Sequence, residues 1–302
     1  MHPEVPVVLR VAMIVVLVAG PLVLLLAGLA RMRGEPRAAT RAGAGAIAVS
    51  TILATLAFNV VFFVQELFLV LPKAFTPGLQ PTLFHNNHTW RGSHPLEDLF
   101  QGTGASATLV LGLACLAVLS RVALRSTLAR FLVFWLSFHG IFMALPQFVV
   151  GAFAPGSDVG RAMAYFALSS EAKRVVALLA LAAIAAASSA LGRRLLAQSP
   201  TAASDGMRAK MRFVFEHATL PALLSIAPII AYRVPREWVE VVFLPVVVAF
   251  VGLGFMQAGA WRRLPASPLA THPLAWSWGP LVGAVALLLV FHGLLRRGIA
   301  FY

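Results

Sequence analysis

The stretch VAMIVVLVAGPLVLLLAGLA, from Val11 to Ala30, contains twenty residues and no charged side chain. At 1.5 Å per residue, such a helix is about 30 Å long, which matches the hydrocarbon core of a bilayer. The run lacks the alternation of a lipid-facing barrel strand, so it predicts a transmembrane helix. A cleaved signal peptide is the alternative, but the run is longer than a usual signal and Arg31 and Arg33 follow it directly.

Seven further runs of similar length and composition follow, in a chain that is 60% hydrophobic and only 12% charged. They predict an all-α fold, a polytopic integral membrane helix bundle with about eight transmembrane helices, forming one membrane domain over residues 1–302. The expected helices cover residues 7–30, 42–70, 102–124, 130–153, 172–194, 213–233, 238–261 and 274–296. An extracytoplasmic histidine-rich loop is expected at 73–101 and a cytoplasmic linker at 195–212.

The net charge of +13 does not predict nucleic-acid binding, because the basic residues lie at the ends of the expected helices. Fourteen of the 24 Lys and Arg residues fall on the side that carries the linker, which is therefore the predicted cytoplasmic side. Arg296 and Arg297 are exceptions to this pattern. The 21 arginines against three lysines and the abundant alanine favour a GC-rich bacterial source, hence a multi-pass protein of the bacterial plasma membrane.

Polar chemistry is concentrated in the segment LFHNNHTWRGSHPLEDLF, at 83–100. Imidazoles are good ligands for zinc or another divalent transition metal, and three of them share this segment. The candidate metal ligands are His85, His88 and His94, with Glu97 and Asp98 available to complete the coordination sphere. The alternative is a polar loop whose histidines bond to water, lipid headgroups or the loop backbone.

Glu66 lies in FNVVFFVQELFLVLPK, with apolar residues on both sides. A carboxylate there costs on the order of 2 to 3 kcal/mol unless it is paired or protonated, so we expect a partner from the histidine loop or Arg91. Asn59 is seven residues earlier and shares the helical face of Glu66. Glu66 is the predicted catalytic residue, as a metal ligand, as a partner that holds a metal ligand, or as a general base. A structural salt bridge or hydrogen bond is the alternative.

Two further histidines lie within expected helices. His139 is about halfway along its helix among Phe and Trp residues, and the adjacent Gly140 permits close approach of another backbone. His292 lies near the outer end of the last helix. Each is a candidate pathway residue, although a neutral histidine bonded to a neighbouring helix explains either one.

Three functions from different classes fit these residues. The first is a membrane-embedded, metal-dependent hydrolase acting on a lipid, lipid-linked or peptide substrate at the outer face. The second is a transporter or channel for protons, metal ions or a small solute, lined by Asn59, Glu66, His139 and His292. The third is a scaffold subunit without catalytic activity, which docks a protein partner through the outer loop or forms a homo-oligomer. The lipid bilayer is a partner in all three.

Overall fold

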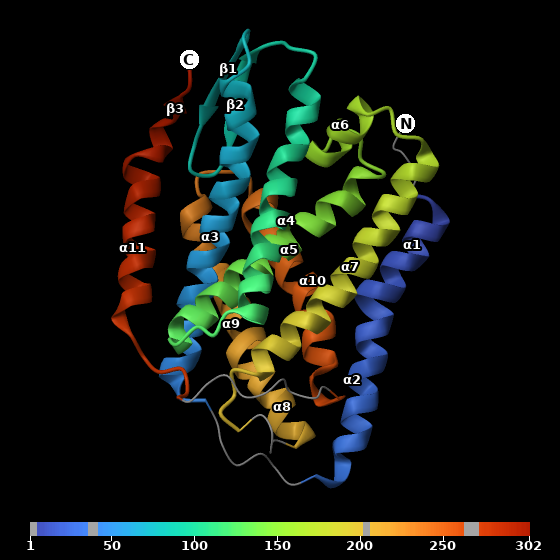
Figure 1. Ribbon diagram of the computed structural model, residues 1–302, viewed down its shortest axis with the longest axis vertical. Helices are drawn as coiled ribbons and strands as arrows, with labels where there is room; N and C mark the ends of the chain where they lie inside the picture. The colour runs from blue at the N-terminus through green and yellow to red at the C-terminus, as the bar shows by residue number, and fades with distance from the viewer. Residues whose placement is uncertain (1–4, 36–41, 202–205, 263–271) are drawn as a thin grey trace.

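The computed structural model describes residues 5–35, 42–201, 206–262 and 272–302 (Figure 1). These residues form eight helical stretches that are long and apolar enough to cross a membrane, which confirms the predicted all-α polytopic bundle. The helices of the first half are α1 (Val7–Ile14), α2 (Gly20–Arg31), α3 (Ala44–Ala74), α4 (Glu97–Arg121) and α5 (Thr127–Gly151). Those of the second half are α6 (Asp158–Tyr165), α7 (Ser170–Leu196), α8 (Met207–Val214), α9 (Leu220–Arg233), α10 (Leu244–Ala258) and α11 (Trp278–Gly293). Short π-helical turns join α1 to α2 and α8 to α9.

Two connections differ in extent from the expected ones. Helix α3 continues to Ala74 and α4 begins at Glu97, so the connection between them is shorter than 73–101. The early start of α4 has a physical reason, since Glu97 and Asp98 occupy its first turn and carboxylates stabilise a helix N-terminus. Within the linker expected at 195–212, residues 202–205 lie outside the described ranges.

Helix α5 forms the centre of the bundle. Most of its residues are apolar, and Phe134, Trp135, Phe138 and Phe142 are almost completely buried. Helices α3, α4 and α7 pack against it. In contrast, the outer helices expose apolar side chains, such as Leu289 of α11, which is 67% exposed. A lipid bilayer covers such side chains in a membrane protein.

Helices α4 and α5 approach each other closely at Gly112 and Gly140. A Cβ atom built on Gly140 would lie 2.6 Å from the Cα of Gly112, closer than real Cβ contacts allow. The hydroxyl of Ser137 also donates to the carbonyl of Gly112, at 2.8 Å. The predicted close approach at Gly140 is therefore confirmed, and it is the small-residue packing typical of membrane helices.

A β-hairpin covers the end of the bundle at which α1 begins and α11 ends (Figure 1). Strand β1 (Leu79–Leu83) pairs antiparallel with β2 (His88–Gly92), and the short β3 (Ile299–Ala300) pairs with the other edge of β1. Because side chains alternate along a strand, His88 and Trp90 lie on the same face of β2. They are opposite Leu83 and Pro81, which are buried, so this face points toward the helices.

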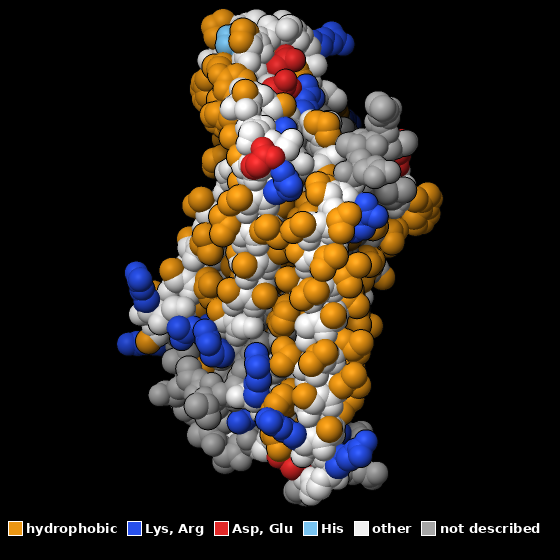
Figure 2. Space-filling model, turned by 90° about the vertical axis from the view of Figure 1, so that its right-hand side faces the viewer, with side chains coloured by type: hydrophobic (Ala, Val, Ile, Leu, Met, Phe, Trp, Pro, Cys, Tyr) orange, Lys and Arg blue, Asp and Glu red, His pale blue; other side chains and the backbone are white. Residues whose placement is uncertain are grey.

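Figure 2 shows how charge is distributed over one side of the molecule. Hydrophobic side chains cover its middle, Asp and Glu lie near the hairpin end, and Lys and Arg gather at the opposite end, where α8 lies. This distribution agrees with the positive-inside pattern of the sequence. We call the hairpin end the outer end, as the sequence predicts.

Candidate functional site

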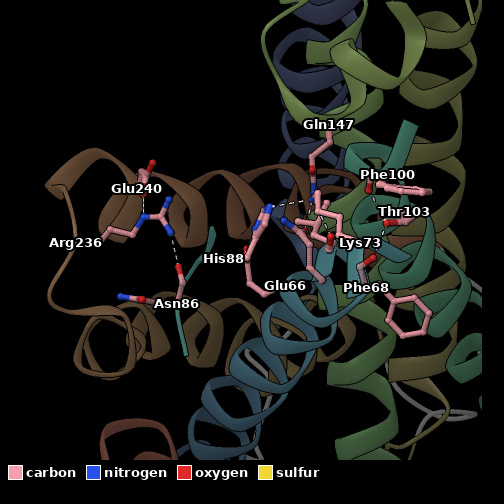
Figure 3. Close-up of polar contacts among 12 residues, drawn as sticks. Glu66, Phe68, Lys73, Asn86, His88, Phe100, Thr103, Gln147, Arg236 and Glu240 are labelled. Carbon is pink, nitrogen blue, oxygen red and sulfur yellow. Dashed lines mark hydrogen bonds and ion pairs between the residues drawn. The ribbon is translucent and has the colours of Figure 1, made fainter. Parts of the chain in front are cut away.

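A carboxylate and an imidazole are paired beneath the hairpin. The Nδ1 of His88 lies 2.8 Å from Oε2 of Glu66, and their side chains are 9% and 7% exposed (Figure 3). Glu66 projects from α3 about two turns before its end, and the inward face of β2 brings His88 over it. The sequence-based expectation that a histidine of this segment is the partner of Glu66 matches this contact.

Lys73 adds a buried cation to the pair (Figure 3). It is seven residues after Glu66 on α3, so both side chains leave the same helical face. Its Nζ donates to the carbonyl of Leu69 at 2.8 Å, lies 3.5 Å from Nε2 of His88, and lies 4.4 Å from the ring centre of Trp90. The residue has no exposed surface, so these contacts replace its hydration shell.

Gln101 of α4 connects Lys73 to a second carboxylate, that of Asp158. With its side-chain amide in the orientation that suits both neighbours, Gln101 accepts from Nζ of Lys73 at 3.3 Å and donates to Oδ1 of Asp158 at 2.9 Å. Asp158 begins α6. Burial raises the pKa of its carboxyl group, and the negative charge of Glu66 raises it further. Two of the cluster's acids therefore influence each other.

Arg161 of α6 completes the cluster at its edge. Its Nε donates to Oδ1 of Asp98 at 2.7 Å, and its guanidinium lies 5.6 Å from the ring centre of Trp90. The Arg161 and Asp98 side chains are 34% and 44% exposed, unlike those of Glu66 and Lys73. We call the set Glu66, Lys73, His88, Trp90, Asp98, Gln101, Asp158 and Arg161 the outer cluster.

The acidic side chains of the outer cluster outnumber its permanent cations. Its three carboxylates face two cations, Lys73 and Arg161. The contacts run from Glu66 through His88, Lys73 and Gln101 to Asp158, so these side chains form a connected series of polar groups.

The structure does not bring the three predicted metal ligands together. Nε2 of His85 lies 3.3 Å from the carbonyl oxygen of Val234, and the ring is next to those of Phe291 and His292. Nδ1 of His94 accepts the backbone N–H of Leu96 at 3.2 Å. Within the described ranges no group of three or more His, Cys, Asp or Glu side chains is arranged to hold a metal ion. These donors do not fit the expected zinc site, and the metal ion stays a prediction.

The other predicted residues are separated from one another. Asn59 is buried and donates to the Thr55 carbonyl at 2.8 Å. Arg91 is exposed on β2, and Oε2 of Glu97 accepts the backbone N–H of His94 at 3.3 Å. Nε2 of His292 lies 3.0 Å from the Ala231 carbonyl oxygen. None of these contacts joins its residue to Glu66.

His139 is packed in the middle of the bundle, 5.6 Å from the Trp135 ring and 5.3 Å from the Phe58 ring. It is almost completely buried. One face of the ring is near the carbonyl of Ala54, but neither ring nitrogen reaches a hydrogen-bond partner of good geometry among the described residues. It is therefore a second buried titratable group, distinct from the outer cluster.

Sequence reasoning missed four members of the outer cluster: Lys73, Gln101, Asp158 and Arg161. Lys73 carried a usable signal, since it follows Glu66 at the same helical spacing that singled out Asn59. Asp158 and Arg161 carried none, because they lie 92 and 95 residues after Glu66 in sequence and only the fold places them nearby.

We compared the chain with protein-family models, curated proteins and solved structures, and no match was found. The fold and the outer cluster define a class of protein, the multi-pass α-helical membrane protein with a buried cluster of ionisable side chains at one end.

Proposed function

We propose that this protein is a membrane-embedded enzyme that uses the outer cluster for acid–base catalysis. The observation that carries the proposal is the series of buried contacts from Glu66 through His88 to Lys73. Ionisable groups buried at the end of a membrane bundle are costly, and proteins retain them chiefly where they serve a function. The reaction class we expect is hydrolysis of a lipid or lipid-linked substrate at the outer membrane surface.

We infer a role for each of three side chains. The carboxylate of Glu66 accepts the Nδ1 proton of His88, which orients the ring and leaves Nε2 as the basic nitrogen. Lys73 holds a positive charge on the far side of that nitrogen. In hydrolysis, His88 would accept the proton of an attacking water, and Lys73 would donate a proton to the leaving group.

The contact between His88 and Lys73 leaves room for such a step. Its length of 3.5 Å exceeds the 2.7 to 3.2 Å that is typical of an N–H hydrogen bond, so the contact is weak. The partly exposed side chains of Trp90, Asp98 and Arg161 form the rim of the cluster toward the outer surface. A polar substrate group approaches the buried pair from this rim.

The test is a product screen with a matched carboxylate variant. Purified protein in nanodiscs of bacterial membrane lipid is incubated, and lipid products are measured by mass spectrometry. We expect the wild type and Glu171→Gln, which changes an exposed carboxylate, to release the same product. Glu66→Gln should be about 100-fold slower or more, because the base His88 loses the carboxylate that orients its ring. Equal rates for Glu66→Gln and the wild type, or no product from any variant, would contradict the proposal.

A second candidate function, proton or solute transport, is favoured by His139 alone. Its position halfway along α5, without a well-formed hydrogen bond, is expected of a group that changes partner during transport. Proton flux into proteoliposomes, followed with an enclosed pH-sensitive dye, tests it. Transport predicts flux that His139→Phe abolishes; equal flux with empty liposomes rejects it. The scaffold role and the protein partner remain proposals without a supporting contact.

A further inference from the structure

A long apolar groove lies on the lipid-facing side of α4, beside the outer cluster. Helices α3, α4, α6 and α7 enclose a space of about 950 Å³. Its walls include Phe68, Ala107, Val110, Val159, Met163 and Val176. The volume is at the upper end of the range for small-molecule sites, about 300 to 1,000 Å³.

The groove has the length and the chemistry of a hydrocarbon site. It follows α4 from Leu99 to Ala114, which is about 22 Å of helix. An acyl chain extends about 15 Å, since two leaflets share a hydrocarbon core of about 30 Å.

The polar groups of the groove wall are already satisfied. The hydroxyl of Thr103 donates to the carbonyl of Phe68 at 2.6 Å, as Figure 3 shows, and that of Ser106 donates to the Gly102 carbonyl at 2.9 Å. The walls therefore present apolar surface that needs no polar ligand.

Cationic side chains lie at the outer mouth of the groove. Two ion pairs there cancel, Asp98 with Arg161 and Glu171 with Arg174. The cation that these two pairs leave over is Lys173. It is one turn before the groove residue Val176, on the same face of α7. Its Nζ makes no hydrogen bond or ion pair with any described residue. Arg161 directly precedes the groove residue Ala162, and Asp98 engages only its Nε, so its terminal nitrogens are available to an anion.

We propose that this groove holds one acyl chain of an anionic phospholipid from the outer leaflet, with the lipid phosphate bound by Lys173 and Arg161. An apolar channel with cations at one end matches the polarity of such a lipid. An uncharged hydrocarbon would not use the mouth, and a free phosphate would not use the groove. The proposal does not depend on the proposed enzymatic function, because a resident lipid and a substrate would bind alike.

Native mass spectrometry of the full-length protein in detergent tests the proposal. The protein is titrated with phosphatidylglycerol or with phosphatidylcholine of the same acyl chains. Ala107→Phe and Val110→Trp fill the groove, and Ala286→Phe adds the same bulk to an exposed position of α11. We expect one tightly retained phosphatidylglycerol in the wild type and in Ala286→Phe, and its loss in both groove variants. Two variants are used so that a folding defect in one, seen as a lowered melting temperature, does not decide the result.

Binding of the lipid phosphate at the groove mouth is tested with a separate variant. Lys173→Gln should reduce the preference for phosphatidylglycerol over phosphatidylcholine about fivefold, the effect of one cation near an anionic lipid. Retention of the lipid by both groove variants at wild-type affinity would overturn the groove assignment. An unchanged headgroup preference in Lys173→Gln, or no preference in the wild type, would overturn the phosphate assignment. Glu66→Gln should bind lipid as the wild type does, so failure of the catalytic proposal is distinguishable from failure of this one.

Discussion

His88 and His85 are three residues apart, but their surroundings differ in charge. His88 faces the carboxylate of Glu66 with one ring nitrogen and the ammonium of Lys73 with the other. His85 faces the backbone carbonyl of Val234, and its ring lies 5.2 Å from that of His292. His88 therefore lies between an acidic and a basic side chain, while His85 lies among groups that carry no negative charge.

The two histidines also differ in what their ring nitrogens contact. A carbonyl oxygen only accepts, so Nε2 of His85 must carry a proton, and its buried Nδ1 has no hydrogen-bond partner among the described residues. Burial lowers the pKa of His85, so its ring stays neutral. It anchors the hairpin to the end of α9. The ring of His88 instead connects an acid to a buried cation.

The largest expected effect comes from removing the buried cation. Lys73→Met keeps the length of the side chain but leaves the carboxylates of Glu66 and Asp158 without it, which should cost roughly 3 to 5 kcal/mol of unfolding free energy. The measurement is unfolding in mixed micelles by titration with sodium dodecyl sulfate. Lys173→Met, at the groove mouth, serves as the matched control and should leave the value unchanged. Equal unfolding free energies of the two variants would show that Lys73 does not stabilise the carboxylates of Glu66 and Asp158.

Acidification should destabilise the His85 side of the hairpin. Because the pKa of His85 is lowered in the folded protein, the unfolded chain binds a proton first as the pH falls below the ordinary value of 6.5. The stability contribution is present above that pH and is lost below it, by up to about 1.4 kcal/mol per pH unit. His85→Gln should remove this part of the pH dependence between pH 7 and 5. The same slope in variant and wild type would place the titration elsewhere.

The contribution of Asp158 to the unfolding free energy should change with pH in the opposite direction to that of His85. Its pKa is raised in the folded protein, so between the ordinary value of 3.8 and the raised one the folded state holds the extra proton. Stability from this group is therefore greatest at low pH and falls as the pH rises through that window. The difference in unfolding free energy between wild type and Asp158→Asn should shrink or change sign from pH 4 to 6. A difference that grows in favour of the wild type would contradict the burial of this carboxyl.

The smallest effect is expected at Arg91, which the sequence suggested as a partner of Glu66. The side chain is exposed on β2 and makes no hydrogen bond or ion pair with the described residues. Arg91→Gln should change the unfolding free energy by less than about 0.5 kcal/mol. A loss of more than 1 kcal/mol in the same micelle titration would show that Arg91 reaches the buried pair.

The fold was predictable because each membrane span is a local feature. Every apolar run long enough to cross a bilayer became a helix, and the ends moved by a few residues where charged side chains extend a helix beyond its apolar part, as at Glu97 and Lys73. The sequence predicts only a histidine-rich loop at 73–101 and not the hairpin, although two turn signals are present. Pro77-Gly78 precedes β1, and Asn86-Asn87 lies in the turn between β1 and β2. Gly78 and Gly92 adopt positive φ there, at 86° and 89°, as glycine does at low cost.

The site was predictable only in part. The pairing of Glu66 with a histidine followed from the cost of burying a carboxylate, which forces a partner. Convergence of three histidines did not follow, because His88 lies on the inward face of a strand whereas His85 lies in the turn before it. The short spacing of the histidines in sequence therefore did not bring their side chains to one site. The contribution of Asp158 depends on the packing of α6 against α4, which no local pattern encodes.

Glu66 and His88 should be energetically coupled, and a double-mutant cycle measures this coupling. Unfolding free energies are determined for Glu66→Gln, His88→Gln and the double variant, with the same cycle for Glu66 and His85 as a control. We predict a coupling of about 1 to 3 kcal/mol for Glu66 with His88, and additive effects within about 0.5 kcal/mol for Glu66 with His85. Additive effects for Glu66 and His88, or equal coupling in the two cycles, would show that the contact between Glu66 and His88 adds no specific stabilisation.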